Sequence, residues 1–254
     1  PESSFLTTFS ATTRKISPFS PDHPFPGLTV PLVFGGQSAP KQSKAEKMQL
    51  YNSAFLLLPD GIFSHYFKHY LFPFTEEIPG EGWLPFLKEL DQKSYRVARG
   101  LKDQLPFRLK SVNGSAQGEV PLGVAICYED MWSEPLRRMV MGGGAEILVA
   151  LSNDAWFQRT LAAAQHHLVG SWRAIELRRY LIRSTVDGVS AIIDPMGREV
   201  ERMPLFQQSV LRAEKVRPLR IASVYSSLGD WPMFILAIGV LAYCLFNSGK
   251  RYLN

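Results

Sequence analysis

Residues 123–132 read GVAICYEDMW, a run of small and β-branched apolar residues that stops at Cys127 and at once turns acidic. The run ends a longer apolar segment, VPLGVAIC at 120–127, whose residue types predict a buried strand. The next segment, SEPLRRMVMGG at 133–143, predicts a helix with Ser133 as its N-cap and Gly142 at its end. A strand that delivers a cysteine at a sharp turn before a helix is one way to present a nucleophile, although a small core cysteine has the same pattern.

Similar apolar runs, separated by turn signals and one long helical segment, lie on both sides of this stretch. We expect a helix at 158–179 and further strands at 28–36, 51–61, 146–152, 180–185, 189–194, 198–203 and 209–215. Strands that alternate with helices and read as continuous apolar runs predict an α/β layered core.

The composition is that of a globular protein with a sizeable core. The chain has 254 residues, of which 46% are hydrophobic and 20% charged, and this excludes a disordered chain. The net charge is +5 and the pI is about 9.2, but the basic residues are spread out and no nucleic-acid motif is present. We therefore expect no nucleic-acid partner, while a basic surface would suit anionic lipid.

The two cysteines allow one disulfide at most, and Cys244 lies inside a long apolar run. A bridge between Cys127 and Cys244 is therefore not expected. No metal site is expected either, because the adjacent histidines of QHH at 165–167 point to different faces of a helix. The chain begins at Pro1 without an initiator methionine or a signal peptide, and we interpret it as a fragment whose upstream part is missing.

Near the C-terminus, WPMFILAIGVLAYCLF at 231–246 contains no charged residue. A bilayer span needs about 20 residues, which the flanking residues supply. We predict a transmembrane helix at 226–249, with a buried core helix as the alternative. Lys250 and Arg251 follow, and the positive-inside rule then places the tail 250–254 in the cytoplasm and the domain 1–225 on the other side.

Several segments occur together in a characteristic order: YNS, FKHYLFPFTEEIP, GVAICYED, SNDAWF, QHH, RAIELRRYLIRST, DGVSAIIDPMG and the closing hydrophobic segment. In this combination the chain resembles the apolipoprotein N-acyltransferases, membrane enzymes with a domain of the nitrilase (carbon–nitrogen hydrolase) superfamily. The resemblance runs nearly the whole length. It implies a four-layer αββα sandwich at 1–225, truncated at its N-terminus and followed by the membrane helix.

The family's Glu-Lys-Cys triad is carried over by matching its motifs. Its nucleophile falls on Cys127, its lysine, which precedes a Pro-Phe segment, on Lys68, and its general base, in a Pro-Glu-Ser/Thr segment, on Glu2. Without the resemblance, Glu2 would be an unremarkable terminal residue and Lys68 a lysine whose stem packs among aromatic residues.

Three further residues match positions near the family's site. Glu76 matches the glutamate after Pro-Phe, although Thr75 stands where the family usually has glycine, which puts the backbone conformation there in doubt. Glu129 matches the second glutamate near the thiol, either in a direct role or in a salt bridge that holds Lys68. Trp156 matches a residue of the substrate pocket, and it could equally be a core tryptophan.

The segment EGWLPFLKEL at 81–90 places Trp83 and Phe86 close together between acidic residues. We interpret it as a mobile arm that contacts lipid and helps to bind substrate. Gly80 and Gly82 would allow it to hinge. The alternative is a short core helix.

The implied reaction is N-acylation of the S-diacylglyceryl cysteine of an apolipoprotein, with a phospholipid as acyl donor and a thioester on Cys127. We expect no cofactor, a monomer, and a bacterial inner-membrane location with the catalytic domain on the periplasmic side. Two alternatives stay open: a nitrilase-type amidase that hydrolyses a small amide, and a catalytically dead, membrane-anchored binding module.

Overall fold

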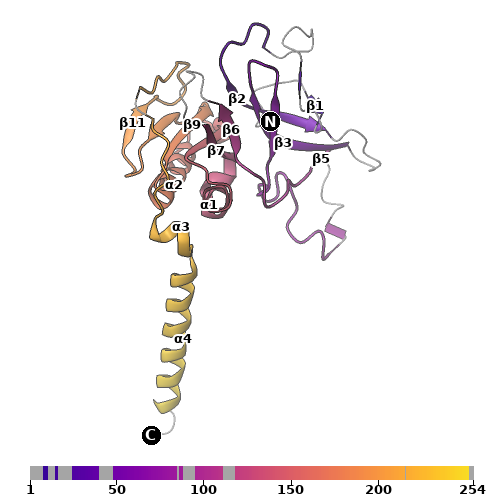
Figure 1. The fold of residues 1–254 in the computed structure, drawn as a ribbon. Coiled ribbons are helices and arrows are strands. Elements are labelled where there is room, and N and C mark those ends of the chain that lie inside the picture. The colour runs from indigo at the N-terminus through magenta and orange to yellow at the C-terminus, as the bar shows by residue number, and fades with distance from the viewer. Residues whose placement is uncertain are drawn as a thin grey trace.

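The computed structural model describes residues 8–10, 15–16, 25–39, 48–84, 86–87, 95–110, 118–214 and 216–251. Two β-sheets pack face to face and form the body of the molecule (Figure 1). The first sheet has five strands in the order β1-β2-β3-β4, with β5 paired to β3. Its strands are β1 (Thr8–Ser10), β2 (Leu32–Ala39), β3 (Met48–Leu57), β4 (Phe63–Phe67) and β5 (Tyr95–Val97).

The second sheet has six strands in the order β11-β10-β9-β8-β7-β6. Its three central strands are parallel and its outer pairings are antiparallel. The strands are β6 (Phe107–Lys110), β7 (Glu119–Ile126), β8 (Ile147–Asn153), β9 (Tyr180–Val186), β10 (Ala191–Ile193) and β11 (Glu199–Arg202). Because β7, β8 and β9 are parallel, their carboxyl ends meet at one edge of the sheet, which is where α/β proteins place their sites.

The core lies between the two sheets and continues under the helices α1 (Ser133–Met141) and α2 (Ala162–Leu177). Alternate residues of β3 point to opposite faces of the first sheet. Ala54 and Leu56 belong to the main core shared with the second sheet, while Phe55 and Leu57 belong to a separate aromatic-rich cluster on the outer face. The main core is therefore common to both sheets, and it fixes how they stack.

The predicted α/β fold is confirmed, but the four-layer form is only partly seen. In the described part of the chain, α1 and α2 cover the second sheet, whereas Ile16, Phe25 and Leu28 pack on the outer cluster of the first sheet in place of a helical layer.

Two predicted elements differ from the structure. The helix expected at 158–179 begins at Ala162, because residues 154–157 form the 3₁₀ helix η3 (Asp154–Phe157), and Gln158 ends it with a positive φ of 48°. The strand expected at 209–215 is wrong for the described residues 209–214, which form no strand. Val210 is 88% exposed, so this stretch has no buried face to pair with the sheet.

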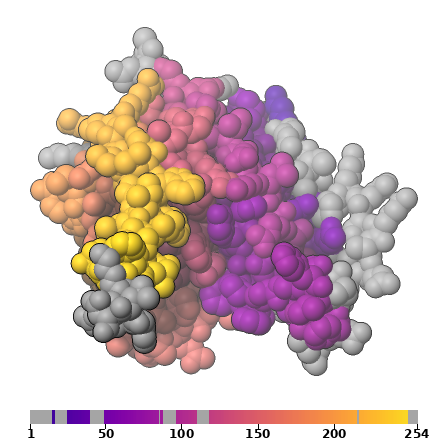
Figure 2. Space-filling view, turned by 90° about the horizontal axis from the view of Figure 1, so that it is seen from below, coloured from indigo at the N-terminus to yellow at the C-terminus, as the bar shows by residue number. Residues whose placement is uncertain are grey.

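The C-terminal segment leaves the body as a long helix. Residues 226–249 are not one helix, since Gly229, with a φ of 59°, ends α3 (Val224–Leu228), and α4 (Trp231–Arg251) starts beyond it. Figure 1 shows α4 projecting away from the sheets, and in Figure 2, seen from below, its yellow residues lie in front of the salmon part of the body. Within the described residues, no helix combines the length and the apolar character that crossing a membrane requires, so the predicted transmembrane helix is not confirmed.

Candidate active site

Cys127 lies where β7 leaves the sheet and the 3₁₀ helix η2 (Cys127–Met131) begins. Its φ is 49°, in the left-handed region that a residue with a side chain seldom adopts. Such a conformation costs of order 1–3 kcal/mol and persists only where the surroundings fix it. The thiol is buried, at 7% exposure, against the core between the sheets. Cys127 therefore lies on a strained turn at the carboxyl end of a parallel strand.

Glu129, two residues further along the same turn, is fully buried and accepts hydrogen bonds from both sheets. Its Oε2 accepts from the backbone N–H of Ile126 at 2.9 Å. Its Oε1 accepts from the hydroxyl of Tyr66 at 2.9 Å and from the N–H groups of His69 at 2.7 Å and Tyr70 at 3.1 Å. This carboxyl therefore joins the Cys127 turn to the end of β4.

The burial of Glu129 changes its acidity. Desolvation raises the pKa of Glu129 to about 7, although the backbone N–H groups of Ile126 and His69 and the charge of Lys68 lower it. Burial also raises the pKa of Tyr66 well above its usual value, and Glu129 raises it further, so the Tyr66 hydroxyl keeps its proton. Glu129 can therefore take up or release a proton near neutral pH.

Lys68 follows β4 directly and is completely buried. Its Nζ forms a salt bridge with Glu76 Oε2 at 2.8 Å. The Glu76 carboxylate also accepts hydrogen bonds from the Asn52 side-chain amide and from the Phe72 N–H. A buried ammonium group needs such a partner, because taking its charge out of water costs several kcal/mol.

The turn that carries Glu76 resolves the question raised by Thr75. The left-handed residue is Phe74, with a φ of 61°, and Thr75 is exposed. The N–H groups of Thr75 and Glu76 both donate to the carbonyl of Phe72, at 3.3 and 2.8 Å. The turn therefore closes without a glycine at position 75, and it brings Glu76 back to Lys68.

The other predicted site residues are placed differently. Trp156 lies on η3 after β8 and is 59% exposed, so it is not a core residue. Trp83 and Phe86 are 92% and 61% exposed, which argues against a short core helix at that segment. Glu2 lies outside the described residues.

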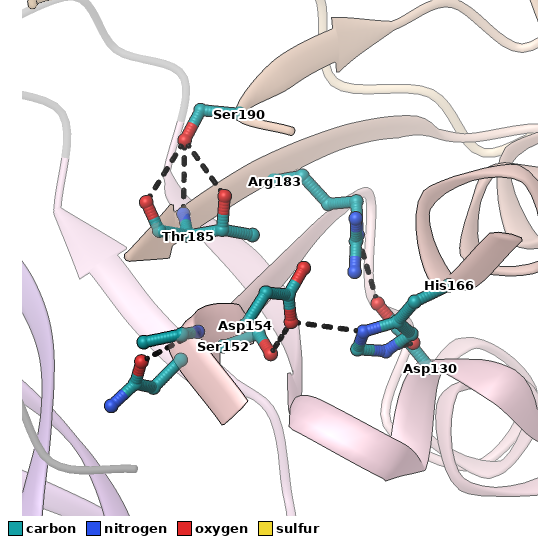
Figure 3. A network of polar contacts seen from close by, with 9 residues as sticks. Asp130, Ser152, Asp154, His166, Arg183, Thr185 and Ser190 are labelled. Carbon is teal, nitrogen blue, oxygen red and sulfur yellow. Dashed lines mark hydrogen bonds and ion pairs between the residues drawn. The ribbon is translucent and has the colours of Figure 1, made fainter. Parts of the chain in front are cut away.

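The sequence did not reveal a second buried polar network on the other side of the Cys127 turn. Figure 3 shows the His166 ring between the carboxylates of Asp130 and Asp154, with Arg183 beside Asp130. The signal was present, since an Asp follows each of two successive parallel strands and a His lies on the next helix. Among the described residues, no group of three or more His, Cys, Asp or Glu is placed to hold a metal ion.

Comparison with known proteins finds relatives over about three quarters of the chain. A family model for carbon–nitrogen hydrolases matches residues 29–220. The chain is 37% identical over 201 residues to an apolipoprotein N-acyltransferase of Vibrio vulnificus and 34% identical over 189 residues to one of Photobacterium profundum. These alignments cover 76% and 74% of this chain but 38% and 35% of the relatives, so the chain spans less than two fifths of their length.

Among solved structures, an amidase from Nesterenkonia sp. aligns with 69% of this chain and 57% of its own, at 18% identity and a TM-score of 0.46. The match to the carbon–nitrogen hydrolase family model shows which parts of the fold are shared. It covers the strands β2 to β11, both helices that flank the second sheet, and the turns that carry Lys68 and Cys127. The chain therefore belongs to the carbon–nitrogen hydrolase family.

Proposed function

We propose that this chain carries the catalytic site of an apolipoprotein N-acyltransferase. The relatives with that name match about three quarters of the chain, and the residues around the thiol are suited to acyl transfer. The observation that carries the proposal is the junction at Glu129. This one carboxyl holds the turn with Cys127 against the strand end with Lys68, through Tyr66 and two backbone N–H groups.

In the first half-reaction, the Cys127 thiolate attacks the carbonyl carbon of a phospholipid acyl ester. Glu2, by its match to the family's base, takes the thiol proton. Lys68 stabilises the oxyanion of the tetrahedral intermediate, and its buried, paired position keeps its charge fixed without reorganisation. The carbon–oxygen bond to the glycerol then breaks, the lysophospholipid leaves with the proton, and a thioester remains on Cys127.

In the second half-reaction, the α-amino group of an S-diacylglyceryl cysteine attacks the thioester. The amine loses a proton, the carbon–sulfur bond breaks, and the thiol of Cys127 is regenerated with the proton. Glu129 holds the Cys127 turn to the strand end that carries Lys68 during both steps, through the N–H groups of His69 and Tyr70. No step consumes a cofactor.

The apolar surfaces support a lipid substrate. Every residue from 231 to 246 on α4 is exposed, and this stretch has no charge. A globular protein seldom exposes an apolar surface of this kind unless it contacts lipid or a partner. We propose that α4 anchors the domain 1–225 to the inner membrane, with the domain on its periplasmic side. The exposed Trp83 and Phe86 would then guide a lipid tail towards Cys127.

The decisive experiment uses mass spectrometry of the intact chain with phospholipid vesicles. Wild type should gain one acyl group on the peptide that contains Cys127, and a diacylated lipopeptide should remove it. Cys127→Ser should form no thioester and lose transfer, because a serine hydroxyl is much less ionised at neutral pH. Acylation at another residue would refute the assignment of Cys127, and turnover of a small amide without any lipid requirement would favour the amidase.

A further inference from the structure

The His166 network connects the turn with Cys127 to the turn with Trp156. Asp130 belongs to η2 and Asp154 opens η3, and these two turns leave the adjacent parallel strands β7 and β8. The His166 Nε2 lies 2.8 Å from Asp130 Oδ1 and its Nδ1 lies 3.0 Å from Asp154 Oδ1 (Figure 3). One ring on α2 therefore spans both turns.

Each carboxylate has a second partner in the sheet. The Ser152 hydroxyl donates to Asp154 Oδ1 at 2.6 Å, and Arg183 Nε donates to Asp130 Oδ2 at 3.0 Å. All the side chains of the network are buried. The network therefore ties the two turns to β8, β9 and α2 inside the protein, where its hydrogen bonds are not weakened by water.

The protonation of His166 follows from its partners. Both ring nitrogens face carboxylate oxygens, so both must donate, which requires the imidazolium form. Burial lowers the pKa of His166, but the hydrogen bonds to Asp130 and Asp154 outweigh it and raise the pKa to about 9. With Arg183 and His166 both cationic, two positive charges balance two carboxylates.

The backbone leaves room for both carboxylates. A Cβ at Gly170 would lie 2.8 Å from Asp130 Oδ2, and a Cβ at Gly188 would lie 2.2 Å from Asp154 Oδ2. Any larger residue at either position would push a carboxylate away from the ring. The fold thus accommodates the network at two separate glycines.

We propose that His166 is a positioning residue that holds the strained Cys127 turn and the Trp156 turn in one fixed relation through Asp130 and Asp154. The left-handed Cys127 needs surroundings that fix it, and Asp130, three residues away on the same turn, is held by both His166 and Arg183. This role rests on the proposed function, because it matters only if Cys127 is the nucleophile.

The test measures how fast iodoacetamide alkylates Cys127, from about pH 5 to about pH 9, in the intact chain. Peptide mass spectrometry separates Cys127 from the exposed Cys244. In His166→Asn, Asp130 loses a cationic partner and the turn loses its clamp, so the pKa of the Cys127 thiol should rise. We expect alkylation at neutral pH to slow by about tenfold, the effect of a pKa change of about one unit.

The matched control is His167→Asn. His167 is the neighbouring residue on α2, but its Nε2 lies 2.7 Å from Glu199 Oε1, away from both turns. This variant should alkylate at the wild-type rate. A folded His166→Asn that also alkylates at the wild-type rate overturns the proposal.

A second variant covers the case in which His166→Asn does not fold. Asp154→Asn keeps the size and one acceptor oxygen but removes a carboxylate that raises the pKa of His166. The ring then loses its charge more easily and Asp130 again loses a cationic partner, so alkylation should slow several-fold in a folded protein. Wild-type alkylation in that folded variant contradicts the proposal.

The alkylation experiment needs no turnover, so it decides the role of His166 independently of the proposed function. A wild-type protein that does not become acylated on Cys127 refutes the proposed function, and the alkylation rates still decide the role of His166. Where turnover is measured, the loss should fall on kcat with little change in KM.

Discussion

Glu129 and Asp130 are neighbours on one turn, yet they enter two different buried environments. Glu129 meets a tyrosine hydroxyl and backbone N–H groups, and burial raises its pKa to about 7. Burial acts on Asp130 in the same direction, but the charges of Arg183 and His166 outweigh it and lower its pKa. A one-residue step along the chain thus separates a carboxyl that can titrate at neutral pH from one that stays ionised.

The difference shows that the partners, rather than the depth of burial, set the chemistry of each carboxyl. Neutral donors stabilise a carboxylate only partly, whereas two cations compensate fully for lost hydration. The Glu129 side of the turn is therefore suited to reaction, and the Asp130 side is suited to structure. Four experiments can break or sharpen this comparison.

The largest effect is expected from Asp130→Asn. This change leaves Arg183 and His166 buried with one compensating charge fewer, and breaking such a pair costs about 3–5 kcal/mol. Glu129→Gln keeps a carbonyl for the N–H donors and should cost only about 1–3 kcal/mol. Urea unfolding of both variants measures the difference, and equal losses of stability would contradict the distinction.

The second experiment tests the reactive side. Lys68→Met should lower acyl transfer by about 10²–10³-fold, as the loss of one oxyanion donor does in other enzymes. Lys68→Arg should also fail, since its planar group does not fit a site built for an ammonium ion. The Lys68 charge lowers the pKa of Glu129, so in Lys68→Met that pKa should rise above 7 in a titration followed by NMR. If Lys68→Met keeps more than about a tenth of the activity, the lysine is structural.

The third experiment separates the two sides by pH. Glu129 has a pKa raised from 4.5 to about 7, so its contribution to stability is complete below pH 4.5 and is lost as the pH rises through 7. His166 has a pKa raised from 6.5 to about 9, so its contribution is complete below pH 6.5 and is lost as the pH rises through 9. Each window is worth roughly 3 kcal/mol.

The measurement for both windows is the free energy of unfolding as a function of pH. In Glu129→Gln, the free energy of unfolding should fall less steeply between about pH 4.5 and 7 only. In His166→Asn, it should fall less steeply between about pH 6.5 and 9 only. A variant that changes both windows alike would mean that the two networks titrate as one unit.

The smallest effect is expected at the exposed arm. Trp83→Ser combined with Phe86→Ser removes two side chains that are mostly in water, so stability should change by less than about 0.5 kcal/mol. The KM for phospholipid should rise several-fold, while alkylation of Cys127 by iodoacetamide should stay at the wild-type rate. Unchanged lipid kinetics in the folded variant would remove this arm from the mechanism.

Much of the second sheet could be predicted from sequence, because its strands are continuous apolar runs with clear turns. The strand expected at 120–127 and the helix at 133–143 match β7 and α1 closely, but Ser133 is not the N-cap: Trp132 holds that position, and the Ser133 hydroxyl donates to Glu176 instead. The stretch 209–214 misled the prediction because the adjacent Val210 and Leu211 resemble the start of a strand, while these described residues pair with neither sheet.

Part of the site could not be predicted, because it depends on which way neighbouring side chains point. That adjacent histidines face different ways was inferred correctly: His166 meets two aspartates and His167 meets Glu199. The different directions of the two rings argued against a metal site. They did not indicate that the His166 ring contacts two turns at once. The pairing of Lys68 with Glu76 likewise depends on the turn at Phe74, whose left-handed conformation no local rule requires.

The hydrogen bonds that Glu129 accepts from Tyr66, His69 and Tyr70 join residues 59 to 63 positions apart in the chain. Contacts of such long range form late in folding, since closing the intervening loop is costly until both sheets exist. The reactive thiol would then arise only when the two sheets dock, which would protect a half-folded chain from untimely acylation. In pulse-labelling hydrogen exchange, the amides of His69 and Tyr70 should become protected after those of the β7–β8 ladder.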